Sequence, residues 1–324
     1  MECGGGSHRF RNRKRQIRRR TPNYNRAALR IVFFGTPAFA VPTLEALVRK
    51  HEIVLVVAQP DKPSGRGMHV HVPAVIEKAH ELGLKTNQPP KVRDVIDDVR
   101  DAKADAGIVV AYGKILPSAL LEIPRHGFLN IHGSILPKYR GAAPIQRAIE
   151  HGEPESGVTI MQVDEQLDHG AMLSVARTPI GPDEHTPSLA ARLSHLGAEA
   201  LLHVLSDLDG HVPIPQDDTQ ATFAPKVEKS EGAVQWSEPA RRIYNKFRAF
   251  DPWPGLFTPS FKLIDIRPVD GSGAAGTIIR VENDGVVVAC GEAAIKLLRV
   301  QRPGKAAVDA RALQWKVGAV IDHV

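Results

Sequence analysis

An asparagine and a histidine two positions apart carry the strongest chemical signal in this chain of 324 residues. Asn130 and His132 end an apolar run, residues 128–132, and Gly133 follows it. Because side chains in a β-strand alternate between two faces, the amide and the imidazole project from the same face at the strand end. Both groups can donate a hydrogen bond to the oxygen of a tetrahedral intermediate, and each such donor typically raises a rate by roughly 10²–10³-fold. The spacing therefore predicts acyl-transfer chemistry.

An acidic loop further along the chain supplies a third candidate, Asp168. The loop follows a β-rich run, residues 157–163, and Gly170 closes it. A carboxylate at this point would either orient His132 or relay a proton. On spacing alone, however, an Asn-x-His pair is more often a turn-capping amide beside a solvated histidine. The wider sequence has to decide between the two interpretations.

Several further motifs, in order along the chain, favour catalysis. Residues 130–146 read Asn-Ile-His-Gly-Ser-Ile-Leu-Pro-Lys-Tyr-Arg-Gly-Ala-Ala-Pro-Ile-Gln, and residues 167–170 read Leu-Asp-His-Gly. The remaining motifs occupy residues 33–40, 59–67, 110–117 and 250–254. From about residue 30 to residue 305 the sequence resembles the folate-dependent formyltransferases, and among them the members that act on methionyl-tRNA.

This resemblance implies transfer of a formyl group from 10-formyltetrahydrofolate to the α-amino group of methionine on initiator tRNA. An α-amino group with an ordinary pKa of about 7.7–8.0 keeps a neutral fraction, so a mild base suffices. The resemblance implies that Asn130 binds the formyl oxygen, and that His132 stabilises the oxyanion and helps proton transfer. It also implies that Asp168 holds His132 in the right tautomer and receives the amine proton. It implies no metal. A formyltransferase acting on a small amine, such as an amino sugar nucleotide, is the alternative, because these motifs are shared.

The same resemblance places the folate co-substrate against two loops. A pterin edge presents donors and acceptors like a nucleobase, so backbone groups are its natural partners. The expected folate-binding residues are Ser134, Ile135, Leu136 and Pro137 in one loop, and Tyr112 and Gly113 in the other. For Ser134 and Pro137, ordinary turn chemistry explains the residue types equally well.

Positive charge gathers at the two ends of the chain. The formal net charge of +6 divides into +9 over residues 1–30, −7 over residues 31–220 and +4 over residues 221–324. We therefore expect residues 221–324 to bind a polyanion through salt-dependent phosphate contacts.

Four cations are candidate tRNA contacts. Arg66 lies in a Gly- and Pro-rich loop, residues 60–67, which either wedges against the tRNA acceptor end, as the resemblance implies, or is only a flexible solvated loop. A predicted amphipathic helix carries Arg241, Arg242 and Lys246. These cations either contact successive phosphates of the tRNA or form only the solvent-exposed face of that helix.

Alternating apolar strands and helices predict an α/β fold for residues 30–209. Strands are expected at residues 31–34, 53–58 and 106–111, and helices at 42–49, 72–82, 117–122 and 188–208. Strands buried on both faces and separated by helices indicate a Rossmann-like, doubly wound parallel sheet. Ligands of such sheets bind beyond the carboxyl ends of the strands, where the motifs would meet. We infer no dinucleotide site, because Gly35-Thr-Pro is not the glycine fingerprint of one.

A smaller β-domain is expected after a polar, proline-bearing linker, residues 210–224. A helix is predicted at residues 240–250, and short strands at 257–266, 276–281, 285–290 and 294–300, which suggests a small β-barrel. The resemblance makes residues 225–324 an OB-like, tRNA-binding domain. We expect Trp236 and Trp253 to pack at the domain junction rather than to serve as base-stacking platforms.

The first 29 residues are rich in arginine and poor in apolar residues, so we expect a basic disordered extension. It has three interpretations: an RNA-binding arm, a transit segment, or translation assigned from too early a start. Cys3 and Cys290 support neither a disulfide framework nor a thiolate zinc site. No apolar run approaches a membrane span. We expect a cytoplasmic monomer, or a mitochondrial matrix protein if the extension is a transit peptide.

Overall fold

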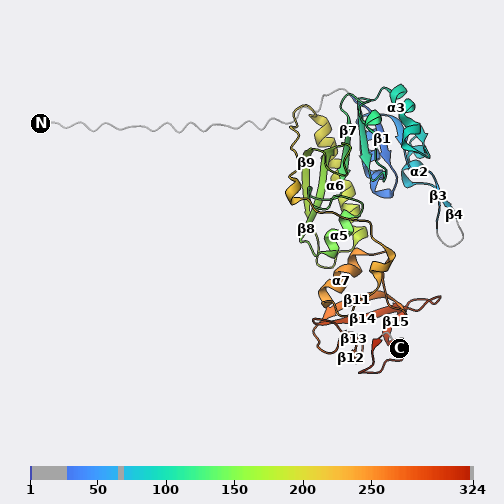
Figure 1. Cartoon of the computed structure of the whole chain (residues 1–324), viewed down its shortest axis with the longest axis vertical. Helices are drawn as coiled ribbons and strands as arrows, with labels where there is room; N and C mark the ends of the chain where they lie inside the picture. The colour runs from blue at the N-terminus through green and yellow to red at the C-terminus, as the bar shows by residue number, and fades with distance from the viewer. Residues whose placement is uncertain (2–27, 65–68, 322–324) are drawn as a thin grey trace.

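The fold is taken from a computed structural model, which describes Met1 and residues 28–64 and 69–321 (Figure 1). Two predictions fall on other parts of the chain. The basic extension lies almost wholly in residues 2–27, and Arg66 lies in residues 65–68, so both are outside the described residues.

A mixed sheet forms the centre of the first domain, with the strand order β5-β2-β1-β6-β7-β8-β9 among the described residues. Its strands are β1 (Arg30–Gly35), β2 (Glu52–Val57), β5 (Thr86–Asn87), β6 (Ala106–Val110), β7 (Phe128–His132), β8 (Glu155–Gln162) and β9 (Met172–Pro179). The strands from β5 to β7 run parallel, which confirms the Rossmann-like prediction. β8 and β9 are antiparallel, so the sheet is mixed at this edge. The connection at residues 163–171 is too short for a crossover, which makes β9 return antiparallel to β8.

Helices cover both faces of this sheet. They are α1 (Val41–Val48), α2 (Ala74–Glu81), α3 (Ile96–Ala102), α4 (Ser118–Leu121), α5 (Pro144–Glu150) and α6 (Thr186–Ser206). In β1, Ile31 and Phe33 join the core beneath α1 and α6, whereas Val32 and Phe34 join the core on the α3 side. The period of two thus buries both faces of the strand. A small hairpin, β3 (Lys62–Ser64) and β4 (His69–His71), projects beside α2 (Figure 1).

The second domain is an antiparallel sheet with one helix, consistent with a small barrel. It contains α7 (Ala240–Ala249), β10 (Leu256–Phe257), β11 (Lys262–Val269), β12 (Ile278–Glu282), β13 (Gly285–Ala289), β14 (Ala294–Gln301) and β15 (Val308–Asp309). The order is β10-β11-β14-β13-β12, with β15 beside β14. The strand predicted at residues 257–266 is in fact a hairpin, because Thr258 N donates to Phe261 O at 2.8 Å and turns the chain.

The two tryptophans considered for packing behave differently. Trp236 is buried, as predicted, with 6% of its surface exposed. Trp253 is 53% exposed, so its prediction as a packing residue is wrong. A Pro-flanked tryptophan fixes the shape of a corner, but it does not decide whether the ring points inward.

The two domains share an apolar core and a buried ion-pair network. Helix α7 of the second domain packs on α5 of the first (Figure 1). On α5, Arg147 is 7% exposed and donates to both carboxylate oxygens of Glu231, at 2.6 and 2.9 Å. The expected linker, residues 210–224, lies along the first domain, where Ile214 pairs with Met172. This segment therefore lies beside the loops that hold the candidate site.

Short 3-10 helices complete the described secondary structure, at Ala38–Ala40, Val92–Val95, Asp218–Gln220, Lys229–Gly232 and Ala310–Ala312. Among the helices of the described residues, none is both long enough and apolar enough to cross a bilayer.

Candidate active site

A cavity of about 630 Å³ opens at the carboxyl ends of β6 and β7. Asn130 and His132 line it from the end of β7, and Asp168 lines it from the loop between β8 and β9. Two large apolar side chains of the lining, Ile115 and Leu167, are 73% and 55% exposed. The three predicted catalytic residues therefore meet in one hollow with an apolar rim.

The carboxylate of Asp168 is the meeting point of the polar groups. One of its oxygens, Oδ1, lies 3.4 Å from Asn130 Nδ2, and the other, Oδ2, lies 3.5 Å from His132 Nδ1. Gly141 N donates to Oδ2 at 2.8 Å. The second ring nitrogen of His132, Nε2, faces the Tyr139 carbonyl oxygen at 2.9 Å. Both ring nitrogens of His132 therefore face oxygen atoms of the site.

Two glycines of the sequence motifs are required by close backbone approach. Gly141 has a φ of +122°, and a Cβ there would lie 2.8 Å from the Ala224 carbonyl oxygen. A Cβ on Gly170 would lie 1.9 Å from the Gln162 carbonyl oxygen. Asp168 itself has a φ of +48°, a conformation that few residues other than glycine adopt. The Arg-Gly and Leu-Asp-x-Gly patterns thus shape the loops around the carboxylate.

Of the residues expected to bind folate, Tyr112 and Gly113 line the cavity. The Tyr112 side chain is almost fully buried, and its hydroxyl has no hydrogen-bond partner among the described residues. Burial raises the pKa of Tyr112 to about 12. Its carbonyl oxygen accepts a hydrogen bond from Gln59 Nε2 at 2.7 Å. The tyrosine hydroxyl is therefore buried away from the cavity surface, and the backbone contacts of this loop with folate stay a prediction.

The other expected folate loop is held by its own hydrogen bonds. Ser134 Oγ donates to the Lys138 carbonyl at 2.6 Å, and Thr159 Oγ1 donates to the Ser134 carbonyl at 2.8 Å. The residues that line the cavity include neither Ser134 nor Ile135, Leu136 and Pro137. Their contact with folate stays a prediction.

The cations predicted on α7 lie away from this cavity. Arg242 and Lys246 share the carboxylate of Glu238, at 3.1 and 2.9 Å. Arg241 donates to the Pro182 carbonyl at 3.4 Å and has no carboxylate partner among the described residues. Sequence reasoning missed Glu238, whose presence four residues before Arg242 is the spacing of a helical ion pair.

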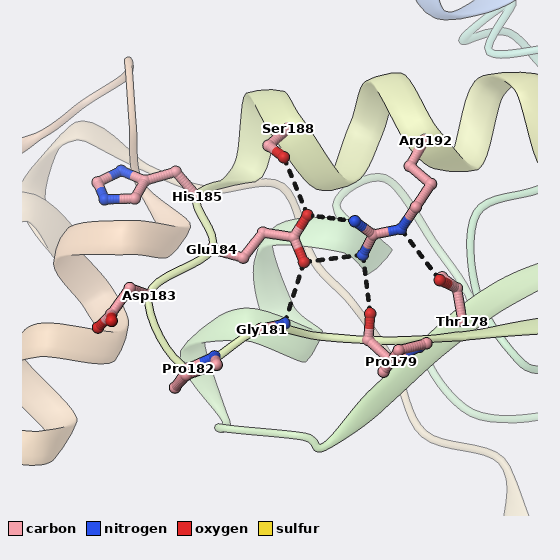
Figure 2. Close-up of a pocket in the computed structure, with 9 residues that line it drawn as sticks. All are labelled: Thr178, Pro179, Gly181, Pro182, Asp183, Glu184, His185, Ser188 and Arg192. Atoms are coloured by element: carbon pink, nitrogen blue, oxygen red, sulfur yellow. Dashed lines mark hydrogen bonds and ion pairs between the residues drawn. The ribbon is translucent and has the colours of Figure 1, made fainter.

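A second hollow, about 730 Å³ in volume, lies in the loop between β9 and α6 (Figure 2). Both carboxylate oxygens of Glu184 accept from Arg192, at 2.7 and 2.8 Å, and they also accept from Ser188 Oγ and Gly181 N. Burial alone would raise the pKa of Glu184, but these hydrogen bonds hold it below its ordinary value. The remaining donors of Arg192 bind Thr178 Oγ1 and the Pro179 carbonyl. In this second hollow, the groove at the start of α6, Glu184 and Arg192 therefore satisfy each other's hydrogen bonds and stabilise the loop.

Sequence reasoning also missed Gln216, which lies in the expected linker and donates to the carbonyl oxygens of Asp168 and Gly170, at 2.9 Å each. No local pattern identifies it, because its partners are backbone atoms distant in sequence. Among the described residues, no group of three or more His, Cys, Asp or Glu side chains is arranged to hold a metal ion.

Solved structures with the same fold include two folate complexes. An N-formyltransferase from Helicobacter canadensis, in complex with folinic acid and dTDP-3-aminofucose, matches with a TM-score of 0.66 at 16% identity, over 85% of this chain and 99% of that one. HypX from Aquifex aeolicus, in complex with tetrahydrofolic acid, matches with a TM-score of 0.62 at 17% identity, over 88% of this chain and 47% of that one. At this identity the likeness concerns the fold.

Sequence comparisons identify the family. The model described as formyl transferase matches residues 29–205, and the model of the formyl transferase C-terminal domain matches residues 226–315. The methionyl-tRNA formyltransferase of Thermus thermophilus is 44% identical over 87% of this chain and 94% of its own length. That of Deinococcus radiodurans is 44% identical over 92% of this chain and 95% of its own length. The chain therefore belongs to the formyl transferase family.

Proposed function

We propose that this chain transfers the formyl group of 10-formyltetrahydrofolate to the α-amino group of methionine esterified to initiator tRNA. The observation that carries the proposal is the convergence of Asn130, His132 and Asp168 in one cavity at the strand ends. Relatives named methionyl-tRNA formyltransferase, which are 44% identical over both domains, support the choice of acceptor.

In this reaction the neutral α-amine attacks the formyl carbon and a tetrahedral intermediate forms. Asn130 Nδ2 and the His132 ring donate to the oxyanion, which is the largest electrostatic contribution expected of such a site. Asp168 accepts the proton that the attacking nitrogen loses, directly or through a water molecule. The bond between the formyl carbon and N10 then breaks, N10 takes up a proton, and tetrahydrofolate leaves.

The contacts around the carboxylate suit this sequence of steps. At 3.4 and 3.5 Å, the approaches of Asn130 and His132 to Asp168 are long for hydrogen bonds, so both donors can turn to a substrate oxygen at little cost. The exposed side chains of Ile115 and Leu167 supply an apolar rim against which a flat heterocycle packs. We assign the folate to this side of the cavity, with Tyr112 and Gly113 as backbone partners. The loop from Ser134 to Pro137 does not line the cavity, and its contact with folate rests on family resemblance alone.

The tRNA is assigned to the basic second domain. Residues 221–324 carry a net charge of +4, whereas residues 31–220 carry −7. Of the α7 cations, Arg241 is free of a carboxylate partner among the described residues, so we expect it to contribute more phosphate affinity than Arg242 and Lys246. Arg66 is assigned to the acceptor end on family resemblance alone.

The acceptor is tested by formyl transfer from 10-formyltetrahydrofolate to three candidates in parallel: methionyl initiator tRNA, uncharged tRNA and an amino sugar nucleotide. Transfer to the charged tRNA alone supports the proposal. Transfer only to the sugar nucleotide would keep the chemistry of the cavity but replace the acceptor. Absence of transfer to all three would contradict both.

A further inference from the structure

One side chain of the segment between the two domains, Gln216, supports the loop between β8 and β9 that carries Asp168. Gln216 is half-buried, while residues 212–215 and 217–220 on either side are exposed. Its Nε2 donates to the Asp168 carbonyl and to the Gly170 carbonyl, at 2.9 Å each. Its Oε1 accepts from Arg140 Nε at 3.0 Å. The amide nitrogen and the amide oxygen are therefore both engaged, and the nitrogen binds two carbonyls of one loop, on either side of His169.

Arg140 fixes the orientation of that amide. Its side chain is buried, and its Nη2 donates to Asp218 Oδ1 at 2.7 Å. The hydrogen bond from Arg140 is the main reason that the pKa of Asp218 lies below its ordinary value. The next residue, Gly141, donates its backbone N–H to the Asp168 carboxylate at 2.8 Å. Asp168 is thus held from two directions, through its carboxylate by Gly141 and through its backbone by Gln216.

The backbone of Asp168 needs this support. Its φ of +48° is an unfavourable backbone conformation for a residue with a side chain, so the surrounding structure has to hold it. Its contacts with Asn130 and His132, at 3.4 and 3.5 Å, are too long to hold the carboxylate by themselves. A small rotation of the loop would carry the carboxylate away from the other two catalytic groups.

We infer that Gln216 is a positioning residue for formyl transfer, which holds Asp168 in its catalytic orientation from the segment that joins the two domains. This inference rests on the proposed function, because it takes Asp168 as the proton acceptor. Gln216 is not itself among the residues that line the cavity, and its hydrogen bonds go to the loop backbone rather than to the Asp168 carboxylate.

The test compares three variants in the full chain with methionyl initiator tRNA as acceptor. Gln216→Met keeps the length of the side chain but removes every hydrogen bond. Gln216→Glu keeps an acceptor for Arg140 but cannot donate to the two carbonyls when ionised. Gln220→Met is the matched control, since Gln220 lies on the same segment, is exposed and donates only to Asp217 among the described residues. Thermal unfolding and circular dichroism confirm that each variant is folded.

We expect both Gln216 variants to lower kcat by about tenfold to a hundredfold, as misplacement of a catalytic group by about 1 Å does. The KM values for tRNA and folate should change by less than about threefold, because only transition-state interactions are lost. Gln220→Met should match the wild type. In an Asp168→Ala background, Gln216→Met should lower kcat by no more than about twofold further, because residues that act as a unit are not additive.

Three results would overturn the inference: unchanged kcat in Gln216→Met, a rise in KM alone, or an equal loss of kcat with and without Asp168. A failure of the proposed function is a different observation, since the wild type itself would then transfer no formyl group to methionyl-tRNA.

Discussion

Two hollows in the described part of the first domain have similar volumes, about 630 and 730 Å³, but their polar groups are arranged in opposite ways. In the groove at the start of α6, Glu184 and Arg192 are paired at 2.7 and 2.8 Å and have additional partners (Figure 2). In the cavity at the strand ends, Asp168 stands 3.4–3.5 Å from Asn130 and His132. Tight mutual pairing stabilises a fold, whereas groups held near one another without tight pairing remain available to a substrate. Volume alone would not have separated the two sites.

Removing a donor from the cavity should have the largest effect. We expect Asn130→Ala and His132→Ala each to lower kcat by about 10²–10³-fold, because each loses one donor to the oxyanion. The affinity for tRNA should change little, since the cavity holds the reacting end only. Single-turnover formylation and a binding titration separate the two quantities. A variant with at least half of the wild-type kcat would remove that residue from the mechanism.

Removing the carboxylate from the groove should change stability instead of rate. Glu184→Ala leaves Arg192 and Gly181 N–H without their acceptor, and we expect the free energy of unfolding to fall by about 1–3 kcal/mol. At 25 °C the kcat should stay within about twofold of the wild type, because kcat reports only interactions made with the reacting groups. Urea unfolding and the transfer assay test both parts. Glu199→Ala, an exposed change on α6, the helix that carries Arg192, is the control.

The pH dependence of stability sharpens the same comparison. Because the folded-state pKa of Glu184 is lowered, the pair contributes fully above the unfolded-state pKa of about 4.3 and loses its contribution as the pH falls through the lower folded value. The stability difference between the wild type and Glu184→Gln should therefore be constant from about pH 8 to pH 5 and shrink below about pH 4. Urea unfolding at a series of pH values measures it. A difference that grows on acidification would mean that burial dominates and the pKa is raised.

The smallest effect is expected on α7, beside the groove. Arg241→Ala should weaken tRNA binding a few-fold and lower the salt slope by about one, as the loss of one phosphate contact does. Arg242→Ala should have a smaller effect, because that side chain is already paired with Glu238. Filter binding at several salt concentrations compares them. A larger loss for Arg242 than for Arg241 would reverse this assignment.

The sequence predicts the first domain well where burial dictates the residue types. Strand β1 is a continuous apolar run because both of its faces are buried, and this alone identifies it. Strand β9 was not predicted, since Ser174 and Arg177 interrupt the apolar residues of a partly solvated edge. Asn130 and His132 could be paired from the strand period, and Asp168 only from its motif.

Features that depend on distant backbone atoms could not be predicted. Gln216 binds two carbonyl oxygens 48 and 46 residues away. Because every residue has a backbone carbonyl, the sequence does not indicate which ones Gln216 binds. The same limit applies to Trp253, because its flanking prolines are visible in the sequence but its exposed ring is not.

A crystal structure with bound 5-formyltetrahydrofolate would show which of the two hollows is the active site. We predict a folate in the cavity of β6 and β7, with its formyl oxygen within hydrogen-bond distance of Asn130 or His132. Folate bound in the groove of Glu184 and Arg192, or in the cavity with its formyl group turned away from Asn130, His132 and Asp168, would contradict the account.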